Sequence, residues 1–152
     1  TANPEDPDRS FIGIELADTA QVNLPFDIDI ETGSIGGPSA GLAFTLTLLD
    51  ELTPGELTGG AKVAVTGTID IRGNVGPIGG IRQKAVAVDQ QDAELFIVPA
   101  GQSAEDLAAV RRILGDDRVA VVATLDEALA ALAAIGGNAL ELGTPGTSYV
   151  PD

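Results

Sequence analysis

The densest run of apolar side chains in this chain extends from Ser39 to Leu52 and directly follows a glycine-rich loop at residues 33–37. The run has almost no polar face, which indicates a helix that is covered on most sides. Pro38 has a φ close to the helical value and no N–H to leave unpaired, so we expect the helix to begin there. Ser39 then lies in the first turn of a buried helix, at the positive end of the helix dipole.

Two strands are expected before this helix. Residues 11–16 form a short apolar run, and residues 26–31 alternate strictly between apolar and acidic side chains. Such alternation indicates a strand with one buried and one solvated face. The acidic residues Asp27, Asp29 and Glu31 are of the type that hard cations prefer, but a solvated strand face explains them, and we predict no metal site.

The second half of the chain alternates between strand and helix patterns. Residues 62–71 suggest a long strand, and Arg72-Gly73-Asn74 supplies a tight turn before residues 75–78 return as a hairpin. The elements expected after Gly79-Gly80 are a helix from 81 to about 91, a buried strand at 94–98, a helix opened by Ser103, a strand at 118–123 and a helix opened by Thr124. This order predicts an α/β fold of mixed α+β character with parallel, right-handed connections.

The 152 residues, 44% of them apolar, are enough for one domain with a substantial core. We assign this domain to residues 10–136. Residues 1–9 are polar and rich in Pro and Asp, as at the end of a linker, and residues 137–152 suggest an irregular tail. The sequence has no apolar run of about 18 residues, so we expect this piece not to insert into a membrane.

Charge and composition exclude several classes of function. The formal net charge is −15, from 23 acidic and 8 basic residues, and no basic cluster stands out. Nucleic acids and anionic membrane surfaces are therefore not expected as partners. Because the chain contains no His and no Cys, it cannot form a Ser-His-Asp triad, a Cys-His pair, a thiolate zinc site or a disulfide. We expect no cofactor, and any nucleophilic chemistry must use another base.

Ser39 and Lys84 each have a structural and a catalytic interpretation. Ser39 can serve as a helix cap or as a nucleophile. Lys84 is one of only two lysines and lies about 60° from the apolar stripe formed by Ile81, Ala85 and Val88 on its expected helix. Its methylenes can lie along the core with the ammonium in water, or partial desolvation can favour the neutral amine that a general base requires.

Three short motifs resemble, in order and spacing, the proteolytic domain of Lon proteases: Gly37-Pro38-Ser39-Ala40-Gly41, then Val65-Thr66-Gly67-Thr68-Ile69 with Arg72-Gly73, then Gly76-Pro77-Ile78-Gly79-Gly80-Ile81-Arg82-Gln83-Lys84. The resemblance runs from about Asp27 to Pro99. It implies a Lon-type fold with mixed sheets and a buried helix starting at the catalytic serine. It also implies a serine endopeptidase with a Ser-Lys dyad, in which Ser39 is the nucleophile, Lys84 is the general base and Thr66 supports the lysine.

The physical properties of the loop fit this assignment. Backbone N–H groups at the start of the Ser39 helix can stabilise an oxyanion, and glycines let a peptide backbone approach closely. The residues assigned to this role are Gly36, Gly37, Pro38 and Ala40. One departure concerns the two residues before the Gly-Pro-Ser-Ala-Gly motif, where many family members have Lys-Asp and this chain has Ile35 and Gly36.

The resemblance also suggests the setting of the domain. The phosphate-binding signature of the Lon ATPase module does not occur in this chain, so we expect peptide hydrolysis without ATP. The motifs are most similar to bacterial membrane-anchored proteins in which a PDZ domain precedes a Lon-type domain. This similarity implies an N-terminal PDZ domain and membrane anchor outside this chain, a location on the outer side of the cytoplasmic membrane with the cytoplasm as the alternative, and unfolded or extended polypeptides as substrates. A homo-oligomer is compatible with it.

Two other functions remain open. A Gly-Ser-rich loop that leads into a helix can bind phosphate, as in small-molecule kinases of a related fold. However, residues 33–41 contain no Lys or Arg, and the net negative charge repels nucleotides. The other alternative is a catalytically inactive peptide-binding or assembly module. A covalent probe directed at activated serines separates these functions, because only an activated Ser39 reacts.

Overall fold

The computed structural model describes residues 2–3, 6–10 and 37–138. The strands expected at residues 11–16 and 26–31 lie outside these ranges, as do Asp27, Asp29 and Glu31. The segment expected to end a linker contains two short antiparallel strands, β1 (Ala2–Asn3) and β2 (Asp6–Ser10). The proposed domain limits stay predictions.

A three-stranded parallel sheet forms the centre of residues 37–138. Its strands are β3 (Val63–Val65), β6 (Leu95–Pro99) and β7 (Val119–Val122), in the order β3-β6-β7. Val63 pairs with Leu95, and Phe96 pairs with Val119. All five residues of β6 are buried, as its apolar sequence predicts for a strand covered on both faces.

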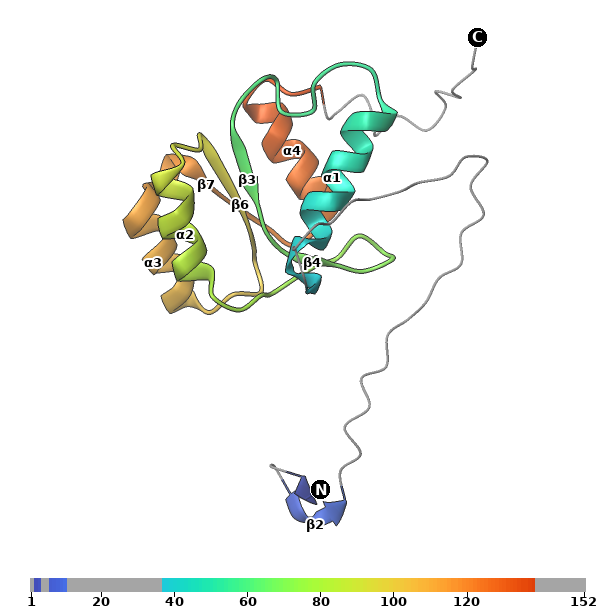
Figure 1. Ribbon diagram of the computed structural model, residues 1–152, viewed down its shortest axis with the longest axis vertical. Coiled ribbons are helices and arrows are strands. Elements are labelled where there is room, and N and C mark those ends of the chain that lie inside the picture. The colour runs from blue at the N-terminus through green and yellow to red at the C-terminus, as the bar shows by residue number, and fades with distance from the viewer. Residues whose placement is uncertain (1, 4–5, 11–36, 139–152) are drawn as a thin grey trace.

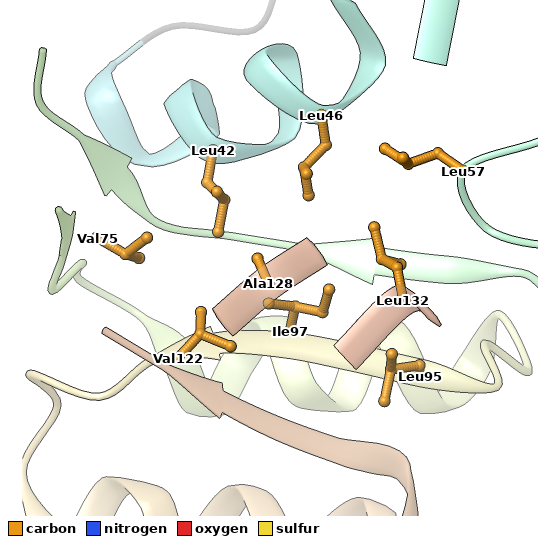
Figure 2. Packing of buried hydrophobic residues seen from close by; sticks show 9 residues of the cluster. All are labelled: Leu42, Leu46, Leu57, Val75, Leu95, Ile97, Val122, Ala128 and Leu132. Atoms are coloured by element: carbon orange, nitrogen blue, oxygen red, sulfur yellow. The ribbon is translucent and has the colours of Figure 1, made fainter. Parts of the chain in front are cut away.

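Four helices cover the sheet, two on each face (Figure 1). Alternate residues of β6 point to opposite faces, so each face receives its own apolar cluster. Leu95 and Ile97 pack with α1 (Gly41–Leu52) and α4 (Leu125–Ala134), as Figure 2 shows. Phe96 and Val98 pack with α2 (Ile81–Gln90) and α3 (Ala104–Leu114). The predicted mixed α/β fold class is confirmed.

Two of the helices begin where the sequence predicts a cap. The hydroxyl of Ser103 accepts a hydrogen bond from the backbone N–H of Asp106 at the start of α3, and Thr124 accepts one from Glu127 at the start of α4. Each of these hydroxyls satisfies an N–H that would otherwise lack a partner in the first turn. Both capping motifs are therefore confirmed.

The long strand expected at residues 62–71 is wrong, because the chain leaves the sheet at Thr66 and Gly67. Residues beyond this point form a separate antiparallel hairpin of β4 (Thr68–Ile69) and β5 (Val75–Gly76). The N–H and carbonyl groups of Gly67 bond to the segment 39–42 instead of to a neighbouring strand. The hairpin itself was predicted, but its first strand is short.

No helix among the described residues is both long and apolar enough to cross a bilayer. Of the predicted irregular tail, the structure describes only Gly137 and Asn138. The N–H of Gly137 donates to the carbonyl of Leu132 near the end of α4.

Candidate active site

Ser39 lies in a single 3-10 turn, η1 (Pro38–Ala40), that leads directly into α1. This turn confirms that the helical segment begins at Pro38, although the α-helix proper starts at Gly41. Gly41 faces the hairpin so closely that an added Cβ would lie 3.3 Å from Cγ2 of Ile69. The absence of a side chain at Gly41 therefore lets β4 lie directly against the turn that carries Ser39.

Three hydrogen bonds fasten the Ser39 turn to Thr66 and Gly67. The carbonyl oxygen of Ser39 accepts from the Gly67 N–H at 2.9 Å and from the Thr66 hydroxyl at 3.1 Å. In return, the Leu42 N–H donates to the Gly67 carbonyl at 3.1 Å. The backbone of the candidate nucleophile is thus held from two sides.

Thr66 connects this turn to the central sheet. Its N–H donates to the carbonyl of Ile97 in β6 at 3.1 Å, and the residue is only 2% exposed. A buried hydroxyl needs a partner, and the Ser39 carbonyl supplies it. The predicted role of Thr66 in supporting Lys84 stays a prediction. A hydroxyl that donates to a carbonyl can still accept a hydrogen bond from an amine.

Lys84 lies in the first turns of α2, at the border of the core. Lys84 is half-buried, whereas its neighbours Ile81 and Ala85 are fully buried in the cluster beneath the helix. This arrangement confirms the position that the helical periodicity predicts. Among the described residues, the Lys84 amine has no carboxylate within ion-pairing distance. The other lysine, Lys62, is exposed, and its amine donates to the carbonyl of Gln91.

The chain path brings the Ser39 turn and the start of α2 to the same end of the sheet. Thr66 and Gly67 follow the carboxyl end of β3, and they hold Ser39 there. Because α2 returns the chain to the beginning of β6, its first turn lies towards the carboxyl ends of the parallel strands. In open α/β sheets, ligands and substrates bind at the carboxyl ends of the strands. The hydrogen bonds of the described residues do not include one between Ser39 and Lys84.

The residues assigned to the oxyanion role are only partly described. Gly36 lies outside the described residues, Gly37 and Pro38 are exposed, and Ala40 is half-buried. Gly37 has a φ of 90°, which favours glycine. The N–H of Gly41 donates to the Pro38 carbonyl, and that of Leu42 donates to Gly67. The N–H groups of Gly41 and Leu42 are therefore not free for the oxyanion role predicted from the sequence.

Sequence analysis missed two features of the site. The first is the fastening of Ser39 by Gly67, for which a glycine inside a strand pattern is a usable signal. The second is the part that Asp70 plays in the predicted hairpin turn, where its carboxylate accepts from the N–H groups of Arg72 and Asn74 and from the Asn74 side chain. The Asn74 side-chain bond, followed by the backbone bonds, lowers the pKa of Asp70 below its usual value. Within the described ranges, no group of three His, Cys, Asp or Glu residues could hold a metal ion.

Comparison with known proteins identifies the family. The model of the Lon protease (S16) C-terminal proteolytic domain matches residues 16–134 of this chain. Lon protease 1 of Sorangium cellulosum is 33% identical over 135 residues, which is 80% of this chain and 16% of that protein. The Lon protease of Haemophilus influenzae is 33% identical over 115 residues, covering 75% of this chain and 13% of that protein.

A third relative, the Lon protease of Lachnoclostridium phytofermentans, is 34% identical over 93 residues, covering 61% of this chain and 11% of that protein. The chain thus spans a small part of the length of these relatives. The family model covers most of the chain, including the Ser39 turn, Thr66 and Lys84. The chain therefore belongs to the family of Lon protease (S16) C-terminal proteolytic domains.

Proposed function

We propose that this protein is a serine endopeptidase in which Ser39 is the nucleophile and Lys84 is the general base. The observation that carries the proposal is the hydrogen-bonded Ser39 turn at the carboxyl end of β3, in a domain of the Lon proteolytic family. The sequence contains no His or Cys, so an amine is the natural choice of base for a serine hydroxyl.

The reaction proceeds in two stages. The neutral Lys84 amine accepts the proton of the Ser39 hydroxyl as its oxygen attacks the scissile carbonyl carbon. The resulting ammonium returns that proton to the nitrogen of the leaving amine, and the peptide bond breaks to leave an ester on Ser39. A water molecule then gives a proton to Lys84 as it attacks this ester. Lys84 passes this proton to the Ser39 oxygen as the ester C–O bond breaks, which releases the acid product and restores the Ser39 hydroxyl and the neutral amine.

The fold supplies electrostatic support for the intermediate. In this proposal, the N–H groups of Ser39 and Ala40, at the positive end of the helix dipole, stabilise the negative charge that develops on the intermediate. We assign the oxyanion contacts to the backbone around Ser39 and Ala40, and the substrate backbone contacts to Gly36, Gly37 and Pro38. We assign to Thr66 a contact with the Lys84 amine, which its hydroxyl can make as an acceptor while it donates to the Ser39 carbonyl.

The wider proposal concerns substrate, energy and location. The exposed Gly37 and Pro38 beside Ser39 suit unfolded or extended polypeptides as substrates. Hydrolysis by this chain needs no ATP, because its sequence has no phosphate-binding loop. The motif similarity supports a place behind a PDZ domain and a membrane anchor, on the outer side of the bacterial cytoplasmic membrane. Homo-oligomerisation is compatible with this arrangement.

The test compares hydrolysis of an unfolded protein substrate by the parent, Ser39→Ala and Thr47→Ala, with and without ATP. Thr47→Ala is the matched control, because it removes an exposed hydroxyl from the same helix. We expect no hydrolysis by Ser39→Ala, parental rates for Thr47→Ala and no effect of ATP. A serine-directed covalent probe should label Ser39 in the parent. Failure of the parent both to hydrolyse the substrate and to react with the probe indicates the inactive binding module instead.

A further inference from the structure

The helix that carries Lys84 begins without the usual means of fixing a helix start. Its N-cap is Gly80, with a φ of 70°, and this residue follows a second glycine, Gly79. No side chain caps α2, and its first turn contains no acidic residue. The neighbouring helix α3 differs in both respects, since it has a Ser103 cap and the acidic residues Glu105 and Asp106 in its first turn.

Arg82 joins the start of α2 to the start of α3. Its Nε lies 2.6 Å from Oδ1 of Asp106, and one of its terminal nitrogens lies 3.0 Å from Oε1 of Glu105. We call these three residues the α2–α3 brace. A guanidinium held by two carboxylates has a defined direction, because its donors lie in one plane.

The Asp106 carboxylate of the brace also has hydrogen bonds within its own helix. The Ser103 hydroxyl donates to Oδ2 of Asp106 at 2.8 Å and accepts from the Asp106 N–H at 3.1 Å. The Ser103 hydrogen bond, together with Arg82, lowers the pKa of Asp106 below its usual value. The Asp106 carboxylate is therefore charged at neutral pH and oriented by its own helix.

The loop that enters α2 is attached to the same part of the chain. The side chain of Gln102 donates to the carbonyl of Ile78 at 3.0 Å. Gly101 lies so close to Pro77 that an added Cβ would be 3.2 Å from Cδ of the proline. The segment before α3 thus holds the entry loop, and the first turn of α3 holds the first turn of the Lys84 helix through the brace.

From this arrangement we propose that Arg82 is a positioning residue for Lys84, acting through Asp106 and Glu105. The inference rests on the proposed Ser39–Lys84 chemistry. Lys84 lies two residues after Arg82 in the same turn, so a rotation of the uncapped start of α2 moves the amine relative to Ser39. Small displacements of a catalytic group cost large factors in rate: about 100-fold for roughly 1 Å.

The other end of α2 provides a matched control. Asp89 forms an ion pair with Arg118 at 3.1 Å, and Arg118 also donates to the carbonyl of Ala93. This second pair ties the same helix to the rest of the fold, but at the end remote from Lys84. Loss of the brace and loss of the Asp89–Arg118 pair each remove an arginine-mediated contact of α2. Only the brace lies next to the proposed base.

The experiment measures kcat and KM for peptide hydrolysis in Arg82→Gln, Arg82→Lys, Asp106→Asn and Arg118→Gln, with melting temperatures as a check on folding. We expect Arg82→Gln and Asp106→Asn each to lower kcat about 10-fold or more with little change in KM, because displacement of the base affects the chemical step. Arg82→Lys should recover part of the loss, since it keeps the charge but not the planar fork. Arg118→Gln should keep the parental kcat.

A double-mutant cycle makes the test specific. If Arg82 acts through Asp106, the double variant should lose no more kcat than either single variant. Parental kcat in a folded Arg82→Gln variant overturns this inference alone, and so does an equal loss in Arg118→Gln. A parent that hydrolyses nothing overturns the proposed function and this inference with it.

Discussion

The two halves of the proposed dyad are held in different ways. Around Ser39, the contacts are mostly between backbone groups: Gly67 donates to the Ser39 carbonyl and accepts from Leu42, and Gly41 lets the hairpin approach directly. Around Lys84, the helix start is uncapped, and the contacts to α3 are made by exposed or partly exposed side chains.

This difference indicates which contacts determine the position of Ser39 and which determine the position of Lys84. Backbone bonds to the buried Thr66 and Gly67 leave few alternative arrangements, so the proposed nucleophile is fixed when the domain folds. Ion pairs between exposed side chains contribute little to stability and compete with water. The helix start that carries the proposed base is therefore held by the buried Ile81 and Ala85 together with surface contacts that can change without unfolding the protein. Substitutions on the two sides should differ accordingly in their effects on stability and on rate.

Among substitutions that leave Ser39 and Lys84 in place, the largest effect on stability and on rate is expected from Gly67→Ala. The added Cβ would lie 2.9 Å from Cγ1 of Val75 and 3.4 Å from Cγ of Pro99, inside the packed core. We expect a loss of about 1–3 kcal/mol in the free energy of unfolding. Hydrolysis should fall at least 10-fold, because Gly67 also holds the Ser39 carbonyl. Urea unfolding and initial rates measure the two effects.

Gly79→Ala is the control for the stability effect, because an added Cβ there meets no atom within 4 Å. Its free energy of unfolding should stay close to that of the parent. An equal loss of stability in the two variants would contradict the view that close packing at Gly67 determines the cost.

A smaller effect is expected from Thr66→Val. This substitution removes the hydroxyl that donates to the Ser39 carbonyl while keeping the β-branched shape. The expected stability loss is about 1 kcal/mol, typical of one hydrogen bond. The kcat for hydrolysis should also fall, whereas Thr66→Ser, which keeps the hydroxyl, should retain most of the activity. If Thr66→Val and Thr66→Ser have the same kcat, the hydroxyl has no role in the site.

The smallest effect concerns the hairpin, through Asp70. Its pKa in the folded state is lowered, chiefly by the hydrogen bond from the Asn74 side chain. A lowered folded pKa stabilises the protein above the ordinary pKa of the group, and this contribution is lost as the pH falls through the folded value. Asp70→Asn should therefore show a slightly weaker loss of stability on acidification. Urea unfolding between neutral pH and about pH 3 tests this expectation, and superimposable profiles would contradict it.

Local patterns predicted much of the fold and part of the site. A few neighbouring residues were enough to predict the helix start at Pro38 and the caps at Ser103 and Thr124. They were also enough to predict that Lys84 lies at the border of the core. The long strand through Gly67 was predicted wrongly, because its end is set by hydrogen bonds to residues 39–42, which are distant in sequence.

The contacts of Arg82 could not be predicted from local patterns either. Arg82 faces solvent, and a solvent-facing arginine on one helix gives no sign of its partners. Asp106 and Glu105 lie more than twenty residues later, on a helix that packs beside α2 only in the folded chain. Such contacts depend on how two helices are placed on the sheet, and a single sequence does not specify this placement.

The central claim is that the amine of Lys84 activates Ser39, and the most direct test is the rate of peptide hydrolysis as a function of pH in the parent, Lys84→Arg and Lys62→Arg. Arginine keeps the positive charge but stays protonated throughout the range, so it cannot accept the serine proton. We predict that Lys84→Arg is inactive at every pH, whereas Lys62→Arg matches the parent, because Lys62 is an exposed residue outside the proposed site. A Lys84→Arg variant with the rate and pH dependence of the parent would contradict the account.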